Sequence, residues 1–441
     1  MPLTICAIRA GHFAGNAGLA GLLMALAACG GQSTPELPAM DLNRDLLTTS
    51  LDVDLSAQEV SARIDFAPAS SRNLSLRIGD LEILGVSNGQ QALDYRIEDA
   101  DGDPRTPARR LDIATGAGTE VVIRYRYRTH TLFDGWSQAG YTFLWPYYCE
   151  NLFPCKPSPA DGLRFDLLLR NVPTGLTAIY PEHLAGDAPS YQLAWTVADY
   201  RWLNLGTTPS GTLIRAAYLN GQELAAIAGT KYLRDEFTWY ESTLGPYPWG
   251  TQAASIEVDW GPDAYGGMEH HPFWHVAAQD YADPTTHAHE AAHGWFGDGV
   301  RIACWEDFVL SEGTASYLAA AAIGAVEGAT REASVWTGYR NQLAAQTHRA
   351  DHPARPSGCN PDFDVLTIDD VIPYYRGALF FASVEHSIGR QRLLAVLRDF
   401  AAAHQGQAAT TQELLDAIRS KTGHDPAAEA QHYLYGLGAI D

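Results

Sequence analysis

A short pattern of two histidines and a glutamate is the strongest chemical signal in this chain of 441 residues. The residues are His289, Glu290 and His293, in the arrangement H-E-x-x-H. Residues four apart lie on one face of a helix, so the two imidazoles can bind one Zn²⁺ ion at about 2.1 Å. The local sequence predicts such a helix, because Asp283 is a good N-cap and Pro284 suits the first turn. A pair of surface histidines on an alanine-rich helix is the alternative that the motif alone leaves open.

A third candidate ligand, Glu312, follows His293 after 18 intervening residues. A carboxylate from a second helix would complete two imidazoles and one oxygen and leave the fourth zinc position for water, as in catalytic sites. Glu290 is not needed as a ligand and stands where a general base could accept the proton of that water. We therefore expect one catalytic Zn²⁺ per chain, held by His289, His293 and Glu312. Taken alone, Glu312 could also be a carboxylate at the start of a helix.

Several motifs resemble, in sequence and in their order along the chain, those of the alanyl aminopeptidase family of gluzincin metallopeptidases, whose relatives include leukotriene hydrolase. The extended zinc motif H-E-x-x-H-x18-E is flanked by residues 295–298 and 305–317, which are similar to the family's W-F-G-N and W-x-D-x-W-L-N-E-G-F-A-x-Y. Upstream, residues 266–270 (G-G-M-E-H) are similar to the exopeptidase signature G-x-M-E-N. Downstream, residues 373–377 (P-Y-Y-R-G) are similar to P-Y-E-K-G. Residues 153–155 are similar to the F-P-C of the family's N-terminal β-domain.

The resemblance implies roles for residues outside the zinc motif. Tyr374 would donate a hydrogen bond to the oxyanion of the tetrahedral intermediate. Glu269 would bind the α-ammonium group of a peptide, with Gly267 and Met268 beside it in the substrate cleft. Trp145 stands where the family has a glutamine that helps to hold the substrate amine, and it would offer an aromatic face instead.

The sequence also departs from the family's pattern. His270 stands where the family has asparagine, and Gly294 where it usually has glutamine. The cluster of His270, His271 and His275 has poor spacing for one metal on a strand, so we expect pocket-lining or structural roles. The chain ends where the family's catalytic domain ends, so we expect a more open cleft than in relatives with the large C-terminal helical domain.

The activity predicted from these residues is the zinc-dependent removal of N-terminal residues from peptides, with Glu290 as the general base. An open cleft leaves a zinc endopeptidase or an amidase as an alternative. A catalytically silent binding homologue is a further alternative. Such homologues typically lose ligands, whereas the three ligands, Glu290 and Tyr374 are all present here.

Two domains are expected to position these residues. In residues 41–212, apolar and polar residues mostly alternate, as in 123–128, and turn clusters separate the runs, which predicts an antiparallel β-sandwich. A helix is predicted over 224–244 and a strand around 254–258. Residues 213–441 are predicted to form a mostly helical domain with a small sheet, which the resemblance makes thermolysin-like. The predicted fold class is therefore α+β.

The charge balance limits the partners of the protein. The 30 basic and 52 acidic residues give a formal charge of -22, which would repel phosphate backbones. We therefore expect no nucleic acid partner, and the peptide substrates are those that the aminopeptidase motifs imply. A hydrophobic content of 46% excludes a disordered chain, and nothing in the sequence indicates an oligomeric state.

The N-terminal residues have the form of a bacterial lipoprotein signal peptide. The apolar stretch 13–28 is too short to span a bilayer and ends in L-A-A-C-G. This pattern predicts a signal peptide over 1–28, a lipidated Cys29 and a polar tether over 29–40. Gly30 rather than aspartate after the cysteine favours anchoring to the outer membrane, on its periplasmic or surface face. An ordinary signal peptide with an incidental cysteine is the alternative.

Four further cysteines in an oxidising compartment allow two disulfides. Cys149 and Cys155 enclose a five-residue loop. Pairing Cys149 with Cys155 and Cys304 with Cys359 is therefore the simplest of three possible connectivities. A zinc knuckle is the alternative, but the sequence contains no C-x-x-C to support it.

Overall fold

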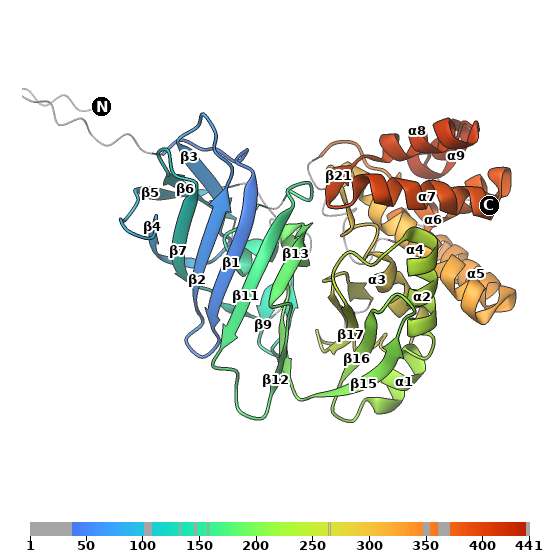
Figure 1. The fold of residues 1–441 in the computed structure, drawn as a ribbon, viewed down its shortest axis with the longest axis horizontal. Helices are drawn as coiled ribbons and strands as arrows, with labels where there is room; N and C mark the ends of the chain where they lie inside the picture. Colours follow the sequence, from blue (N-terminus) through green and yellow to red (C-terminus); the bar gives the residue numbers. More distant parts are fainter. Residues whose placement is uncertain are drawn as a thin grey trace, which may run out of the picture. The chain divides into compact units, whose positions relative to one another are not determined.

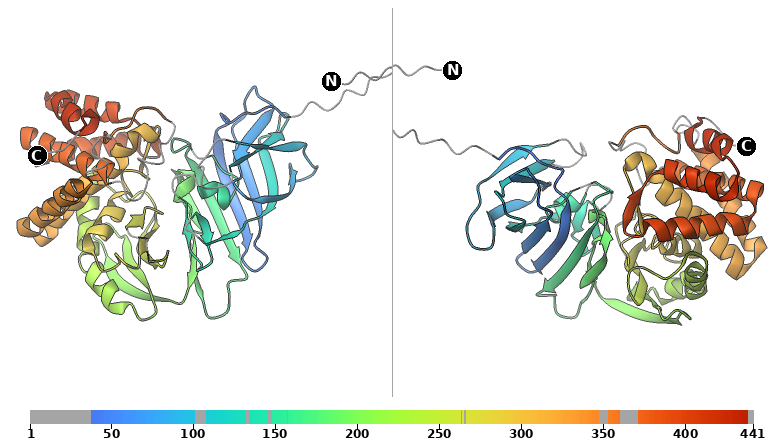
Figure 2. Two further views of the ribbon diagram at one scale, coloured as in Figure 1. Left: turned by 180° about the vertical axis from the view of Figure 1, so that it is seen from behind. Right: turned by 45° about the horizontal axis from the view of Figure 1, so that its top comes forward.

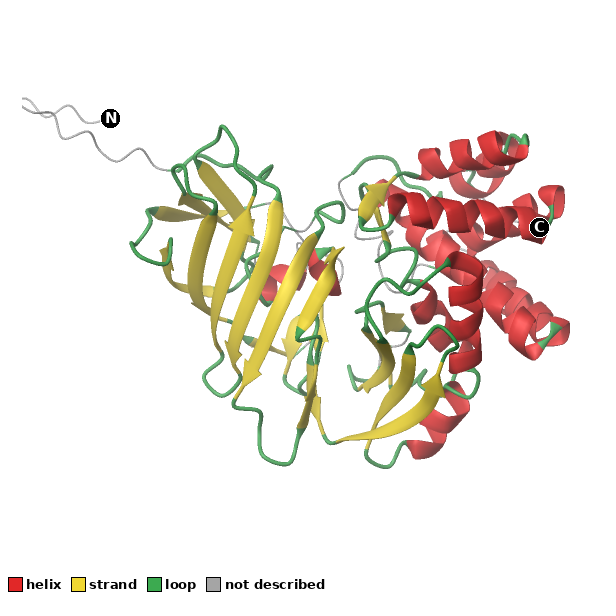
Figure 3. Ribbon diagram, in the orientation of Figure 1, coloured by secondary structure: helices red, strands yellow, loops and turns green. Residues whose placement is uncertain are grey.

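The computed structural model describes most of the chain beyond the predicted signal peptide and tether. The residues it describes are 38–100, 108–131, 134–144, 148–156, 158–262, 264, 266–346, 353–359 and 371–437. The predicted signal peptide, the lipidation site Cys29, nearly all of the tether and the candidate substrate contact Trp145 therefore lie outside the described residues. Strands dominate the first half of the described chain and helices the second half (Figures 1 and 3).

The N-terminal half is built on a six-stranded sheet with the strand order β13-β11-β1-β2-β7-β4. A three-stranded sheet with the order β3-β6-β5 accompanies it. Neighbouring strands in these two sheets are antiparallel except β1 and β11, which run parallel. The strands are β1 (Leu46–Asp54), β2 (Glu59–Phe66), β3 (Asn73–Arg77), β4 (Glu82–Ser87), β5 (Tyr95–Asp99), β6 (Arg109–Ala114), β7 (Glu120–Arg126), β11 (Leu163–Arg170) and β13 (His183–Ala188). The predicted β-structure of this half is confirmed, but the parallel pairing of β1 with β11 departs from the fully antiparallel arrangement that was expected.

Short elements and a disulfide complete this half. Small sheets are formed by β8 (Thr129–His130), β9 (Gly135–Ser137) and β10 (Thr142–Phe143), and by β12 (Thr177–Ile179) and β14 (Thr196–Ala198). Two 3-10 turns are η1 (Tyr148–Asn151) and η2 (Ser190–Gln192). Cys149 is bonded to Cys155, and Cys304 to Cys359, so the predicted disulfide pairing is confirmed.

A five-stranded sheet with the order β15-β16-β17-β19-β18 begins the second half. Its strands are β15 (Tyr200–Thr207), β16 (Leu213–Leu219), β17 (Gln252–Val258), β18 (Gly267–Met268) and β19 (Phe273–Ala277). β17 confirms the strand expected around 254–258. The predicted domain boundary after residue 212 falls between β15 and β16, two strands that pair in this sheet. The boundary itself stays a prediction.

The helical part differs in one place from the expectation. The helix predicted over 224–244 is two helices, α1 (Glu223–Gly229) and α2 (Leu233–Leu244). The first one ends where the Thr230 backbone and hydroxyl both donate to the Ala226 carbonyl oxygen. The other elements are α3 (Pro284–Ala292), β20 (Val300–Ile302), η3 (Trp305–Asp307), α4 (Phe308–Glu327), α5 (Ala329–Ala345), α6 (Ile372–Ile388), α7 (Arg390–His404), β21 (Gln407–Ala409), α8 (Thr411–Thr422), α9 (Ala427–Ala430) and η4 (Gln431–Tyr435).

Helix α4 is the core of the helical part. Every residue in Phe308–Ile323 is buried, and α4 packs against α3, α5 and α6. Gly313 of α4 and Gly377 of α6 let the two backbones approach, since a Cβ on either would lie 2.6 to 2.7 Å from the other's Cα. The segment Trp305–Glu327 is long and apolar enough to cross a membrane, but 83% of its apolar window is buried within the protein, as in a core helix. The C-terminal helices, orange to red in Figure 2, follow α4 in the chain.

Candidate metal centre and peptide cleft

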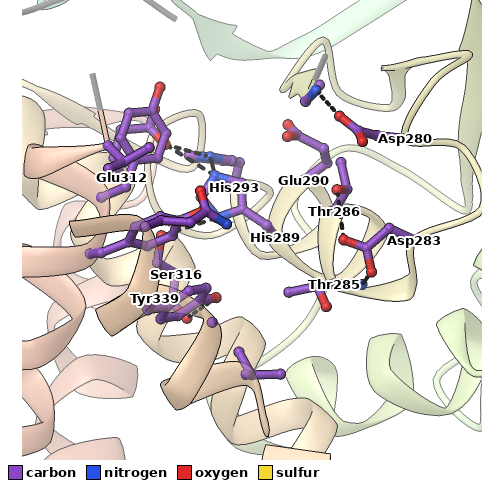
Figure 4. A pocket seen from close by; sticks show the side chains of 18 of the residues that line it. Asp280, Asp283, Thr285, Thr286, His289, Glu290, His293, Glu312, Ser316 and Tyr339 are labelled. Atoms are coloured by element: carbon purple, nitrogen blue, oxygen red, sulfur yellow. Dashed lines mark hydrogen bonds and ion pairs between the residues drawn. The ribbon is translucent and has the colours of Figure 1, made fainter. Parts of the chain in front are cut away.

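The three predicted zinc ligands come together at one point (Figure 4). His289 lies in α3, His293 follows directly after its last residue, and Glu312 lies in α4. His289 Nε2 lies 3.0 Å from His293 Nε2 and 3.1 Å from Glu312 Oε2, and His293 Nε2 lies 3.3 Å from that same oxygen. Three atoms that bind one Zn²⁺ tetrahedrally at about 2.1 Å lie roughly 3.4 Å apart. The donor set therefore fits a zinc ion.

The helix that carries the histidines starts as the sequence predicts. The Asp283 side chain accepts a hydrogen bond from the backbone N–H of Thr285, and Pro284 occupies the first helical position. Because the cap fixes the start of a short helix, the four-residue spacing brings His289 and His293 onto one face. Helix α4 contacts α3 on that face and supplies Glu312.

Both imidazoles are also held through their second ring nitrogen. His293 Nδ1 lies 3.0 Å from the carbonyl oxygen of Phe296 and 3.2 Å from Ser311 Oγ. His289 Nδ1 lies 3.3 Å from Ser316 Oγ. A carbonyl oxygen can only accept a hydrogen bond, so His293 Nδ1 carries the proton and its Nε2 offers a lone pair to a metal.

The electrostatics of the site favour a bound cation. Burial opposes ionisation of Glu312, but the nearby imidazoles outweigh it and lower the pKa of this carboxyl to about 2. Burial also lowers the pKa of His289. For His293, burial works against a charge, yet Glu312 and Glu269 outweigh it and raise its pKa. An ionised carboxylate beside two imidazoles, all enclosed in protein, is the environment in which a divalent metal ion replaces protons.

Glu290 points into the cleft beside the ligands and is not one of them (Figure 4). It is 4% exposed, and burial raises the pKa of its carboxyl well above the usual value. Gly267 of the edge strand β18 lies directly against it, since a Cβ at this position would be 2.6 Å from the Glu290 Cδ atom. A side chain at residue 267 would therefore displace the carboxylate.

Glu269 lies at the end of the same strand and is 4% exposed. Donor atoms of Glu269, Glu290 and His293 all lie within 4.8 Å of one another. Burial, the largest cause, raises the pKa of Glu269 to about 7, while hydrogen bonding from the Tyr191 side chain works in the opposite direction. The adjacent Met268 is buried. The residues predicted for the amine end of the cleft thus lie beside the metal centre.

The cleft itself has a volume of about 560 Å³, a size typical of sites for small ligands. It is lined by the three ligands, Glu290, Glu269, Gly267, Met268 and Tyr374, together with residues from the first turn of α3 and from α5. The Tyr374 ring lies with its centroid 5.8 Å from that of His289. Of the predicted site residues that the structure describes, each one lines this cleft.

The histidine cluster is buried beside the site but separate from the three ligands. His270 and His275 pack edge to face with ring centroids 4.8 Å apart. His271 Nε2 lies 2.8 Å from the Glu290 carbonyl oxygen. Among the described residues, none of these histidines belongs to a group of three with metal-binding geometry.

Several residues that support the site were missed by sequence reasoning. Ser316 follows Glu312 by four residues in α4, so helical spacing could have revealed it. Ser311 precedes Glu312 directly. Tyr191 and Gln192 come from η2 in the N-terminal half, and no local pattern links them to the site.

Comparison with known proteins finds similarity to metallopeptidases. Residues 276–431 match the family model described as the peptidase family M1 domain. It is 24% identical over 298 residues to leucine aminopeptidase 2-1 of Meyerozyma guilliermondii, covering 62% of this chain and 46% of that protein. It is 31% identical over 155 residues to aminopeptidase N of Streptomyces lividans, covering 34% and 18%. The chain thus spans about half or less of the length of these curated relatives.

Solved structures share the fold. A mutant M1 zinc metallopeptidase from Deinococcus radiodurans with a bound Tyr-Ser-Ala substrate superimposes with a TM-score of 0.73 at 17% identity, covering 92% of this chain and 97% of that one. Yeast LTA4 hydrolase in complex with bestatin superimposes with a TM-score of 0.73 at 19% identity, covering 90% of this chain and 68% of that one. The predicted α+β class is confirmed by this likeness.

Proposed function

We propose that this protein is a zinc aminopeptidase that removes residues from the N-terminus of peptides. The observation that carries the proposal is the three-ligand centre with two further buried carboxylates, Glu290 and Glu269, turned toward it in one cleft. One carboxylate serves the chemistry and the other recognises the substrate amine. The names of the relatives, aminopeptidase N and leucine aminopeptidase, agree with this assignment.

The ligands would be His289, His293 and Glu312. A Zn²⁺ ion held there would supply Lewis acidity to the scissile carbonyl group and would make a water molecule easier to deprotonate. Glu290 accepts the proton of the attacking water and passes it to the leaving amine, a role that suits a carboxyl with a raised pKa. Tyr374, whose hydroxyl keeps its proton because burial raises its pKa, donates a hydrogen bond to the oxyanion.

Glu269 would bind the α-ammonium group of the peptide. A charge-assisted hydrogen bond inside a buried cleft is stronger than the same contact in water. Because Glu269 lies so close to Glu290 and the ligands, a peptide held by its amine presents its first peptide bond to the base. A zinc endopeptidase or amidase would not need this carboxylate, and a silent homologue would not need the intact ligand set.

The metal assignment is tested by counting zinc in purified protein. The wild-type chain should hold one zinc ion, and Glu312→Ala should lose most of it, because two imidazoles alone bind zinc weakly. Glu82→Ala, at an exposed position of β4, is the matched control and should keep the full zinc content. Full occupancy and activity in Glu312→Ala would refute the assignment.

We also propose that Cys29 is lipidated and anchors the protein to the outer membrane of a bacterial cell envelope. The support is the L-A-A-C-G sequence and the Gly30 that follows the cysteine. The N-terminal peptide of the native protein should carry the mass of attached acyl chains and the protein should sediment with membranes. Cys29→Ser should abolish both, and an unmodified cysteine would refute the anchor.

A further inference from the structure

His271 joins two parts of the cleft by hydrogen bonds from its backbone and its side chain. Its backbone N–H donates to the Glu269 carbonyl oxygen at 2.7 Å. Its ring Nε2 lies 2.8 Å from the carbonyl oxygen of Glu290 in α3. One residue therefore connects the segment of the proposed amine-binding carboxylate to the helical turn that carries the proposed base.

The partners of the ring fix its protonation. The Glu290 carbonyl can only accept, so Nε2 carries the proton. Nδ1 then accepts the hydroxyl hydrogen of Tyr247, whose oxygen lies 2.7 Å away. Burial lowers the pKa of His271 to about 3, so the ring is neutral and keeps this single tautomer.

The Glu290 carbonyl needs this partner. Helix α3 ends at Ala292, and the backbone N–H of Gly294 donates to the Ala291 carbonyl instead of to that of Glu290. The last carbonyls of a helix have no partner within the helix. His271 therefore caps the end of the zinc-binding helix at the residue that acts as the base.

A glycine makes room for this cap. A Cβ on Gly294 would lie 2.9 Å from Tyr247 Cε2 and 3.1 Å from His271 Cε1. A side chain at this position would displace the Tyr247–His271 pair.

The N-terminal half holds the other side of His271. Gln192 of η2 donates from Nε2 to the His271 carbonyl oxygen at 3.0 Å, and both residues are buried. The His271 ring also packs against Trp274 with centroids 5.0 Å apart. Three segments of the chain therefore restrain one residue between Glu269 and Glu290.

We propose that His271 is a positioning residue that sets the separation between the amine-binding Glu269 and the base Glu290, and thereby directs cleavage to the first peptide bond. The proposal rests on the proposed aminopeptidase function and adds the residue that determines which peptide bond lies beside the base. It also gives the N-terminal half a part in specificity, through Gln192.

Two substitutions distinguish the hydrogen bond to the Glu290 carbonyl from the packing of the imidazole ring. In His271→Gln, the amide nitrogen can take the place of Nε2 and still donate to the Glu290 carbonyl. In His271→Asn, the shorter amide lies on the Tyr247 side and cannot reach this carbonyl. The assay compares kcat/KM for a tripeptide with a free α-amine and for the same peptide without that amine. His386→Asn, at an exposed position of α6, is the control for a histidine change.

His271→Asn should lower kcat/KM for the free-amine peptide by between tenfold and a hundredfold, the size of effect caused by a small misplacement of reacting groups. The ratio of kcat/KM for the free-amine peptide to kcat/KM for the peptide without the amine should fall as well. For His271→Gln, kcat/KM should stay within about threefold of wild type. Zinc content should not change. An unchanged ratio in folded, zinc-loaded His271→Asn would overturn the proposal.

A second measurement keeps the test decisive. In Glu269→Gln, the contact that positions the peptide amine has already been lost, so adding His271→Asn should lower kcat/KM only a little further. If His271 were purely structural, the two substitutions would lower kcat/KM independently and their effects would add. If His271→Asn does not fold, Tyr247→Phe removes only one oxygen and should shift the substrate ratio several-fold in the same direction. Failure of the wild-type protein to prefer the free-amine peptide would instead refute the proposed function itself.

Discussion

Replacing Gly267 by alanine should damage catalysis without damaging the fold. The new Cβ would lie 2.6 Å from Glu290 Cδ and Oε1 and 2.7 Å from Cγ. These atoms form the free end of a flexible side chain, so the carboxylate can move away and the backbone need not. To regain an ordinary contact of 3.4 Å from 2.6 Å, it must retreat by about 0.8 Å. A displacement of this size costs about a hundredfold in rate, or about 2.7 kcal/mol in the activation barrier.

The assay is kcat for a free-amine peptide, with zinc content and Tm measured on the same preparations. Gly267→Ala should show the loss in kcat, one zinc ion per chain and a Tm close to that of wild type. Gly85→Ala in β4, where a Cβ would meet nothing within 4 Å, is the matched control and should match wild type in all three. Wild-type kcat in folded, zinc-loaded Gly267→Ala would refute the placement of Glu290 as the base.

Three further predictions concern the cleft and stability. Tyr374→Phe should keep zinc and lower kcat by roughly a hundredfold, about 3 kcal/mol, because the oxyanion loses its donor; unchanged kcat would exclude this role. Burial raises the pKa of Glu236 to about 8 from an ordinary 4.5, so the folded chain binds more protons than the unfolded one between these pH values. The free energy of unfolding should then fall as pH rises from about 5 to 8, and Glu236→Gln should raise Tm at pH 8, by roughly 2 to 4 °C per kcal/mol, but hardly at pH 5. Cys359→Ser opens the loop closed with Cys304 and should lower stability by about 4 kcal/mol in denaturant unfolding, while an unchanged midpoint would show that this disulfide constrains little.

The ligands were predictable because their information is local. The four-residue spacing of His289 and His293 and the cap at Asp283 follow from helix geometry, and the structure brings Glu312 to them. The alternation of apolar residues likewise predicted the β-domain. In each case a short stretch of sequence determines which side chains share a face.

The support of the site was not predictable, because it depends on contacts between distant segments. Gln192 is hydrogen-bonded to His271 although the two residues are 79 positions apart in the sequence, and Tyr247, which is 24 positions from His271, is hydrogen-bonded to its ring. The parallel pairing of β1 with β11 also joins distant strands. The break between α1 and α2 is local, but the periodicity that predicted one helix over 224–244 does not reveal it.

The most direct test of the aminopeptidase assignment compares one zinc-loaded preparation on a peptide with a free N-terminus and on its N-acetylated form, with products identified by mass spectrometry. Acetylation removes the positive charge that Glu269 is proposed to bind. The assignment predicts stepwise release of single N-terminal residues from the free peptide, loss of this activity on zinc removal, and an intact acetylated peptide. Equal cleavage of both peptides at internal bonds would contradict it and identify an endopeptidase.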